Sequence, residues 1–530
     1  MTPEKQKSKH KLLLVALLAL FALAAIGKSL LIPSTRVAGN APFVPPRGTV
    51  AYSEQIDFQQ AMKKSYTPDT KPEDNGFRDI LSVFGRTIFN EIPDENWQYL
   101  CKELEWNPDE QSNVIYVSLR DFLRDELKKT EEKGMDEKIL NGKVSDILFS
   151  FDKPEVEEAN LRLLEQWIKA TDPAFVAMVE ALKKPGYFLP PTFSEGRPDL
   201  THSAFAQREL ARMCQYRQNL HTRTGDAEKA YEDVYTAFLL TRKYYSQPFV
   251  NSTVFAVAFE RAAVASFIDV LKSGLLSEEQ LRQCLTDLER LPERGKLEDK
   301  LASERLGVLQ CISEFPEKGA KTFRIAPSDE SLLPPVGFEK EKEALKTGVD
   351  NWLRIYRKLP FDWNLVAEVF NAEFDKLEGK ETKQTFEQTI PEDLTFGVLQ
   401  KMSQKERSIV LGKVFFESYA PKPNQYEQII NEAENSVNLA KVAIGLELYK
   451  KSAGQYPASL DLLLEKGILD NIPNDLYRKP DPGPFSYRCE TPEQYILYSF
   501  GPNGEDNGGK RWTSIPPDDR AWDDVVVEMP

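Results

Sequence analysis

The sequence predicts a mainly α-helical protein of 530 residues, with an apolar anchor at its N-terminus and a small α+β domain at its C-terminus. Residues 12–27 form an uninterrupted apolar run, and residues 75–420 repeat apolar side chains at 3- and 4-residue spacing. Residues 485–527 contain short β-branched and aromatic runs. Hydrophobic residues make up 41% of the chain and aromatic residues 11%, which is typical of folded protein. A mostly disordered chain is therefore excluded.

The first 32 residues are expected to form a signal anchor in a bacterial inner membrane. Four lysines between residues 5 and 11 precede the apolar run, which reaches about 20 residues, the length that spans a bilayer, when Lys28 snorkels at the boundary. The lysines predict a cytoplasmic N-terminus, a single pass and an exported, periplasmic body. Ala22–Ala24 also fits a signal-peptidase site, so a cleaved leader is the alternative. The apolar residues that continue past this site favour retention.

The charge of the chain excludes nucleic acid as a partner. Residues 1–32 hold five Lys or Arg and one Asp or Glu, so the exported part carries 63 basic and 82 acidic residues. Such a surface repels phosphate backbones and anionic lipid, which leaves the N-terminal helix as the expected contact with the membrane. Five cysteines without a C-x-x-C pair argue against a disulfide scaffold, and at least one of them must be unpaired.

Residues 33–74, rich in Pro, Gly, Ser and Thr, are predicted to be an extended linker, and residues 75–420 an all-helical body of antiparallel hairpins. We expect this body to divide at two places: at a loop near residues 185–199 and at a polar connection near residues 317–335. Its most regular part is predicted to form helices at 200–220, 226–245, 251–273, 277–291 and 296–311. Further helices are predicted at 75–89, 92–106, 119–127, 154–182, 338–359, 362–377 and 399–419.

Residues 424–530 predict a separate α+β domain, a long helix on a three- to four-stranded antiparallel sheet. The helix is expected over 424–452 and ends at Gly454, where a left-handed cap suits glycine. A short helix at 459–466 follows. Aromatic and β-branched residues between Pro, Gly and Asp then predict strands at 485–488, 495–500 and 525–527.

The loop between the last two predicted strands is the candidate metal site. Its oxygen-bearing side chains include Asn503 and Asp506, four glycines bend it, and Asp523 and Asp524 return nearby. Clustered carboxylate, amide and backbone oxygens suit Ca²⁺, which takes six to eight oxygen ligands. The alternative is a polar hairpin loop that binds no metal.

The order of motifs in this tail resembles the C-terminal domain of the major pseudopilin of bacterial type II secretion systems. The shared features are a helix ending at Gly454 with Tyr456 and Pro457 after it, the stretch 481–487, the glycine-rich stretch 495–509 and the closing Asp523-Asp524. The resemblance implies a Ca²⁺ ion held by Asp506 together with Asp523 or Asp524. Asn503 stands where the family has an aspartate.

The resemblance covers about the last fifth of the chain, and the helical body resembles no family known to us. Pseudopilins begin with a short leader ending in glycine, followed by an apolar helix with a glutamate at its fifth position, and this sequence has neither. We therefore do not expect the chain to polymerise as a pilin subunit. The resemblance implies partners among envelope or secretion-system proteins.

No catalytic signature is present, which favours a non-enzymatic role. The three histidines are His10 in the anchor and His202 and His221 at opposite ends of one predicted helix, too far apart to share a metal ion. We expect an exported envelope protein with a binding or structural role linked to type II secretion or pilus-like machinery. The alternative is an exported hydrolase of glycans or peptides with an acidic site in the helical body. Glu260 with another helix carboxylate is one example of such a pair, and the sequence does not select among the 83 Asp and Glu residues. A passive spacer differs from the first hypothesis only in lacking a specific partner.

Overall fold

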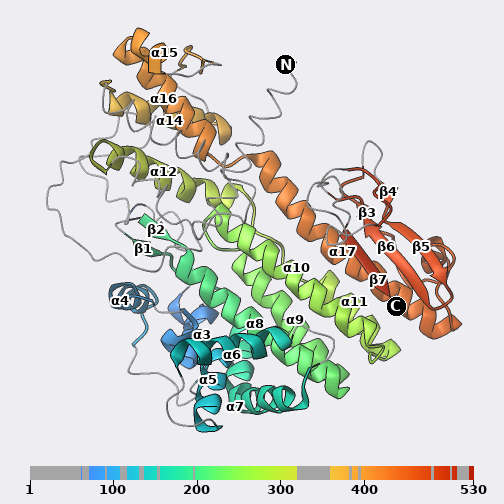
Figure 1. Ribbon diagram of the computed structural model, residues 1–530. Helices are drawn as coiled ribbons and strands as arrows, with labels where there is room; N and C mark the ends of the chain where they lie inside the picture. Colours follow the sequence, from blue (N-terminus) through green and yellow to red (C-terminus); the bar gives the residue numbers. More distant parts are fainter. Residues whose placement is uncertain are drawn as a thin grey trace.

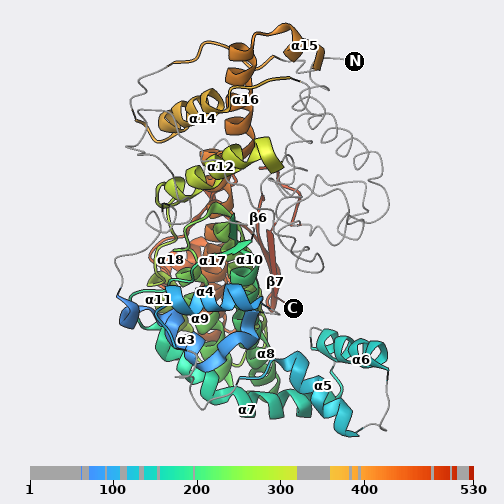
Figure 2. The same cartoon turned by 90° about the vertical axis from the view of Figure 1, so that its left-hand side faces the viewer.

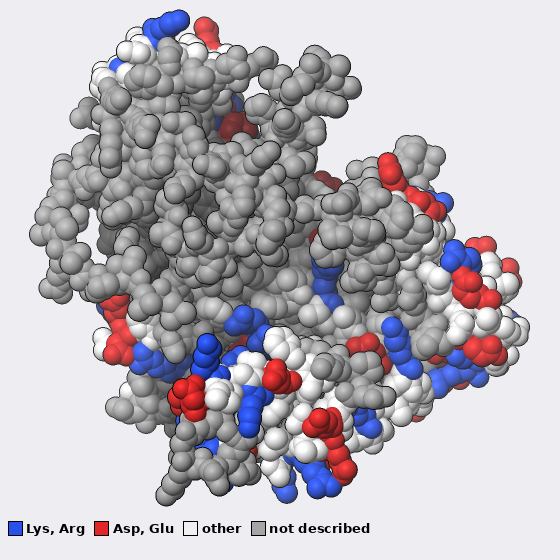
Figure 3. Space-filling view, in the orientation of Figure 1, with Lys and Arg blue, Asp and Glu red and all other residues white. Residues whose placement is uncertain are grey.

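The computed structural model confirms a mainly helical protein with a small antiparallel sheet near its C-terminus. It describes residues 61, 71–89, 92–107, 116–130, 136–151, 156–194, 197–318, 359–380, 385–391, 396–478, 483–501, 504–509 and 525–529. Acidic and basic side chains are interspersed on the part of the described surface that Figure 3 shows.

The N-terminal part of the body is a group of short helices packed on one long helix. In chain order these are η1 (Pro72–Asp74), α3 (Gly76–Phe84), η2 (Gly85–Phe89), α4 (Asp94–Glu103), α5 (Leu119–Thr130), α6 (Glu137–Ser150) and α7 (Glu158–Leu182). A Cβ on Gly76 would stand 2.1 Å from the carbonyl oxygen of Ala181, so glycine permits the close approach of α3 to α7. The predicted loop at 185–199 contains a hairpin, β1 (Thr192–Ser194) and β2 (Arg197–Asp199).

Four helices joined by short turns form the centre of the body, as predicted: α8 (Thr201–Thr224), α9 (Ala227–Tyr244), α10 (Val250–Lys272) and α11 (Glu278–Glu289). Gly225 ends α8 at φ 80°, in the left-handed region, and the Asp226 carboxylate accepts the Lys229 N–H to begin α9. Ser277 and Gln280 form the predicted capping box of α11. Helix α9 packs against both α8 and α10 (Figure 1).

A second group of helices stands at one end of the molecule, opposite α5, α6 and α7 (Figure 2). It contains α12 (Glu298–Lys318), α14 (Trp363–Leu377), α15 (Phe396–Lys401) and α16 (Gln404–Tyr419). The single helix predicted at 399–419 is two helices, because Ser403 and Glu406 form a capping box that begins α16. The helix predicted at 338–359 lies outside the described residues.

The C-terminal unit begins with the longest described helix, α17 (Pro423–Ala453), which ends at Gly454 with φ 77°, as predicted. It continues with α18 (Asp461–Glu465), β3 (Asn474–Asp475), β4 (Gly483–Pro484), β5 (Ser486–Thr491), β6 (Gln494–Ser499) and β7 (Val525–Met529). Strands β5, β6 and β7 form one antiparallel sheet with β6 in the middle, and β3 and β4 pair separately. The sheet therefore has three strands in the described part of the chain.

The hydrophobic cores do not follow the order of the chain. One core of buried apolar residues runs from α3 to α11 and continues into α17 and the sheet. The other joins α12, α14, α15 and α16 to Tyr426 at the start of α17. Helix α17 lies between α10 and α11 on one side and the sheet on the other (Figure 1). It therefore belongs by packing to the body as much as to the C-terminal unit.

The predicted anchor at 1–32 lies outside the described residues, and of the predicted linker at 33–74 only residues 61 and 71–74 are described. Within the described segments, no helix combines the length and the apolar character needed to cross a membrane. The anchor stays a prediction.

Candidate functional site

The predicted metal loop is described only in part. Asp506 is exposed, and its Oδ1 accepts hydrogen bonds from the Tyr498 hydroxyl at 3.0 Å and the Gly508 N–H at 2.9 Å. These bonds fold the loop back onto β6. Asn503, Asp523 and Asp524 lie outside the described residues. Among the residues that are placed, no three His, Cys, Asp or Glu side chains are grouped so as to hold a metal ion.

A buried carboxylate next to this loop fastens the sheet to α17. Asp475 is 1% exposed, and its Oδ1 accepts the Asn435 amide at 2.9 Å, the Ser499 hydroxyl at 2.7 Å and the Tyr477 N–H at 3.0 Å. Its Oδ2 accepts the Phe500 N–H at 2.8 Å. Four donors thus surround one carboxylate, which offsets the cost of burying it. The site joins α17, β3 and β6, and no local pattern in the sequence predicts it.

Glu260, the carboxylate considered for hydrolysis, lies fully buried on α10 and is engaged on both oxygens. Arg242 Nε donates to its Oε1 at 2.8 Å, and Arg294 Nε donates to its Oε2 at 2.9 Å. The Tyr245 hydroxyl donates to the same Oε2 at 2.8 Å. Two guanidinium groups and a hydroxyl surround this carboxylate, which therefore joins Arg242 to Arg294 in one ion-pair network and has no side open to a substrate. We find no second carboxylate paired with it for catalysis in the described residues.

The network around Glu260 continues into α17. Arg294, 7% exposed in its side chain, also donates to the Glu434 carboxylate. Burial opposes ionisation of Glu434, yet Arg294 holds its pKa below the ordinary value. Nearer the surface, Arg261 on α10 pairs with Glu432 on α17. The C-terminal unit is therefore joined to the body by buried and half-buried ion pairs as well as by apolar packing.

Helix α12 adds a second polar junction beside this network. Lys300 is 1% exposed and donates to the carbonyl oxygens of Tyr245 at 2.9 Å and Gln247 at 2.5 Å. Burial lowers its pKa to about 8. One turn further along, the Glu304 carboxylate accepts the Val250 N–H at 2.7 Å at the start of α10, and burial raises its pKa to about 7. Both side chains fix the turn between α9 and α10.

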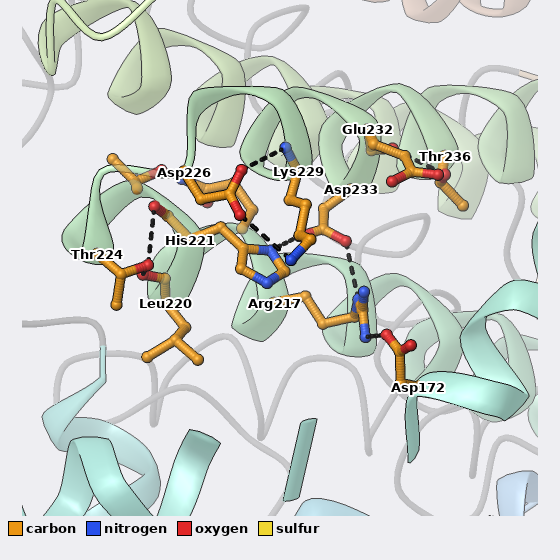
Figure 4. Close-up of polar contacts among 12 residues, drawn as sticks. Asp172, Arg217, Leu220, His221, Thr224, Asp226, Lys229, Glu232, Asp233 and Thr236 are labelled. Carbon is orange, nitrogen blue, oxygen red and sulfur yellow. Dashed lines mark hydrogen bonds and ion pairs between the residues drawn. The ribbon is translucent and has the colours of Figure 1, made fainter. Parts of the chain in front are cut away.

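The hairpin of α8 and α9 contains a histidine–aspartate pair (Figure 4). His221 Nδ1 lies 2.6 Å from Asp233 Oδ2, and Arg217 Nε donates to the other oxygen of Asp233 at 2.8 Å. Arg217 also donates to Asp172 on α7 at 2.9 Å and stacks over the Phe175 ring at 3.8 Å. Both oxygens of Asp233, which is 1% exposed, thus have polar partners, and Arg217 supplies the opposite charge.

This pair does not activate the nearby thiol. Cys214 lies on the same part of α8, and burial and then the charge of Asp233 raise the pKa of its thiol far above the ordinary value. A thiol held in that form is a poor nucleophile near neutral pH. As predicted, His202 lies at the other end of α8, where its Nδ1 is 3.5 Å from the Phe89 carbonyl oxygen. The two histidines do not meet.

The five cysteines are free thiols, three of them buried. The structure has no disulfide bond among these five residues.

Comparisons with protein-family models, with curated proteins and with solved structures give no match. The resemblance of the tail to the major pseudopilin therefore stays a prediction from its motifs.

Proposed function

We propose that this chain is a membrane-anchored, exported envelope protein whose helical body holds a pseudopilin-like C-terminal unit for docking to partners. The observation that carries the proposal is the position of α17. This helix is shared between the body and the sheet, and the polar groups on it are bonded to both. A sheet fixed in this way is presented at a constant orientation to the body, which suits a docking role.

The same observation supports a non-polymerising role. Helix α17 is covered by α10 and α11 along the face that turns away from the sheet.

In the described part of the chain, Glu260, Asp233 and Asp475 are each engaged by cations or hydrogen-bond donors, so none of these three is free to act as an acid or a base. The hydrolase hypothesis has no observation in its favour here.

Partner binding is tested by placing a photo-crosslinking amino acid at Arg488, exposed on the edge strand β5, and at Glu279, exposed on α11. In cells, we expect crosslinks from Arg488 to components of a secretion or pilus-type assembly and none to these components from Glu279. Recovery of the same proteins from both positions, or of no assembly component from either, would contradict docking through the sheet.

The membrane anchor is tested separately, because the prediction of an anchor can be wrong while the prediction of docking through the sheet is right. Membranes are extracted with alkaline carbonate and the pellet is probed for the full-length chain. We expect the chain to stay in the pellet, and protease added to spheroplasts to digest the body. A carbonate-soluble chain, or a body protected in spheroplasts, would exclude an inner-membrane anchor with an exported body.

We further propose that the loop containing Asp506 binds Ca²⁺, on the strength of its resemblance and of its glycine-bent course. A ligand at about 100 times its Kd stabilises a protein by about 2.7 kcal/mol. We expect added Ca²⁺ to raise, and a chelator to lower, the melting temperature of the full-length chain. Asp506→Ala should abolish the effect, and Asp470→Ala, an exposed aspartate elsewhere in the unit, should not. No shift in the unaltered chain would show that the loop binds no Ca²⁺.

A further inference from the structure

A cavity of about 170 Å³ lies between α8, α9 and α10. Small side chains border it on all three helices, including Ala211 on α8, Ala237 on α9 and Ala263 on α10. Because helices in a packed core normally fill such space with larger apolar groups, this hollow is a departure from ordinary packing. Phe259 on α10 also lines it.

The polar residues that line the cavity have unused hydrogen-bonding capacity. Gln218 is 1% exposed; its Nε2 donates to Thr222, but its buried Oε1 has no hydrogen-bond partner among the described residues. The buried Nε of Arg208 likewise has none there. Unsatisfied buried polar atoms are costly, so their presence on the wall of a cavity points to a ligand that supplies the missing partners.

The charges at the cavity favour an anion. Arg208 and Arg212 both line it, whereas Asp233, the one acidic residue that lines it, is already paired with Arg217 and His221. The guanidinium of Arg208 lies 4.5 Å from the Phe205 ring centroid, which holds it in place. Burial, followed by the nearby charge of Arg212, lowers the pKa of Arg208, and the opposing charge of Glu209 does not cancel this shift.

We propose that this cavity binds a small carboxylate with an unbranched apolar chain and a hydrogen-bond donor at its far end. The carboxylate lies on Arg208 and Arg212, the chain lies on the alanines, and the donor reaches Gln218 Oε1. Arg212 and Gln218 are six residues apart on α8, a rise of about 9 Å, and an extended eight-carbon chain built of about 1.5 Å bonds has a similar length. The volume is below the range of about 300–1,000 Å³ that suits drug-sized ligands, so a fragment of this size fits.

Three ligands test the proposal on the unaltered full-length chain by isothermal titration calorimetry. 8-Hydroxyoctanoate has the carboxylate, the chain and the donor; octanoate lacks the donor, and 1,8-octanediol lacks the carboxylate. We expect 8-hydroxyoctanoate to bind most tightly and each of the others about tenfold more weakly, the size of effect that one hydrogen bond or one charge-assisted bond supplies. Failure of 8-hydroxyoctanoate to bind at millimolar concentration, or equal affinity for the three ligands, would overturn the proposal.

Variants then assign the parts of the site. Arg212→Gln, at an exposed position, should weaken both carboxylates and leave 1,8-octanediol unchanged. Gln218→Leu should remove the advantage of 8-hydroxyoctanoate over octanoate. Arg282→Gln, an exposed arginine on α11, is the matched control and should change nothing. Unchanged binding in Arg212→Gln would place the ligand elsewhere.

One further variant tests the cavity itself. Ala262→Leu fills it from an exposed edge, with small risk to folding, and should weaken all three ligands. Melting curves confirm that each variant is folded, and the ligand series on the unaltered chain decides the outcome without any of them. The inference depends neither on the membrane anchor nor on the C-terminal unit.

Discussion

Helix α17 has two faces, and the polar groups that hold them differ in kind. Toward the body, carboxylates of α17 meet arginines: Glu434 pairs with Arg294 and Glu432 with Arg261. Toward the sheet, the neutral amide of Asn435 donates to Asp475. The body face is therefore held by charge against charge, and the sheet face by one carboxylate surrounded by uncharged donors.

The difference shows how a buried charge can be tolerated in two ways. Near the body, Glu260 is compensated by two guanidinium groups. Removing it leaves Arg242 without a counter-charge and Arg294 with Glu434 alone. Near the sheet, Asp475 is compensated by hydrogen bonds alone, so removing it leaves donors without acceptors. The first loss is the more costly, because unpaired buried charge costs more than unpaired buried dipoles.

The largest effect is expected for Glu260→Gln. Arg242 and Arg294 would stay buried beside a neutral amide, and breaking a buried ion pair in this way costs about 3–5 kcal/mol. Urea unfolding of the full-length chain measures the loss. Glu278→Gln removes an exposed partner of Arg282 on α11 and should cost about 0.5 kcal/mol or less. A loss below about 1 kcal/mol for Glu260→Gln would mean that the network does not secure the body face.

A smaller and more local effect is expected for Asp475→Asn. One oxygen becomes an NH₂ group that faces donors, so at least one buried N–H or O–H loses its acceptor, at about 1–3 kcal/mol. Hydrogen exchange should quicken at the Tyr477 and Phe500 amides, which Asp475 accepts, and stay unchanged in α10. Asp470→Asn, at an exposed position, is the control. Quickened exchange throughout α10 would show that the two faces of α17 are not independent.

Sequence patterns correctly predicted helices whose ends are marked by capping residues close together in the chain. Two helix ends are marked by motifs no longer than four residues: the capping box of Ser277 and Gln280 at the start of α11, and Gly454 at the end of α17. These ends of α11 and α17 were therefore predicted correctly. Helix α6 was missed, because Ile139 and Phe149 are 57% and 69% exposed and blur the apolar stripe that indicates a surface helix. The break before α16 was missed, although the capping box at Ser403 could have revealed it.

The networks could not be predicted, because they join residues far apart in the chain. Arg294 contacts Glu260 across 34 residues and Glu434 across 140, and Asn435 contacts Asp475 across 40. No periodicity links such positions. Asp475 lies between Pro473 and Pro480 and directly after Asn474, a pattern that indicates a turn. Glu260 was considered only as one member of a catalytic carboxylate pair, so its role within an ion-pair network was not predicted.

The smallest expected effect is a difference in how the stability contributed by each face of α17 depends on pH. Burial opposes ionisation of Glu434, but Arg294 lowers its pKa overall, so Glu434 stabilises the fold above about pH 4.5 and loses that contribution as the pH falls through its folded pKa. On the sheet side, burial raises the pKa of Glu447 despite the hydroxyl of Tyr456, which donates to it. There the folded state holds the proton more tightly, so stability falls as the pH rises from about 4.5.

Glu434→Gln and Glu447→Gln should therefore change the stability curve in opposite senses. Relative to the unaltered chain, Glu434→Gln should be less stable at pH 7, by roughly 0.5–1 kcal/mol for a half-exposed ion pair, and should approach the unaltered chain near pH 3. Glu447→Gln should gain relative stability as the pH rises from 4 to 7, because glutamine keeps an acceptor for the Tyr456 hydroxyl and has no charge to bury. Urea midpoints at several pH values measure both curves. Parallel curves of urea midpoint against pH would mean that the two faces of α17 share one electrostatic environment. The distinction between a body face held by ion pairs and a sheet face held by uncharged hydrogen-bond donors would then be wrong.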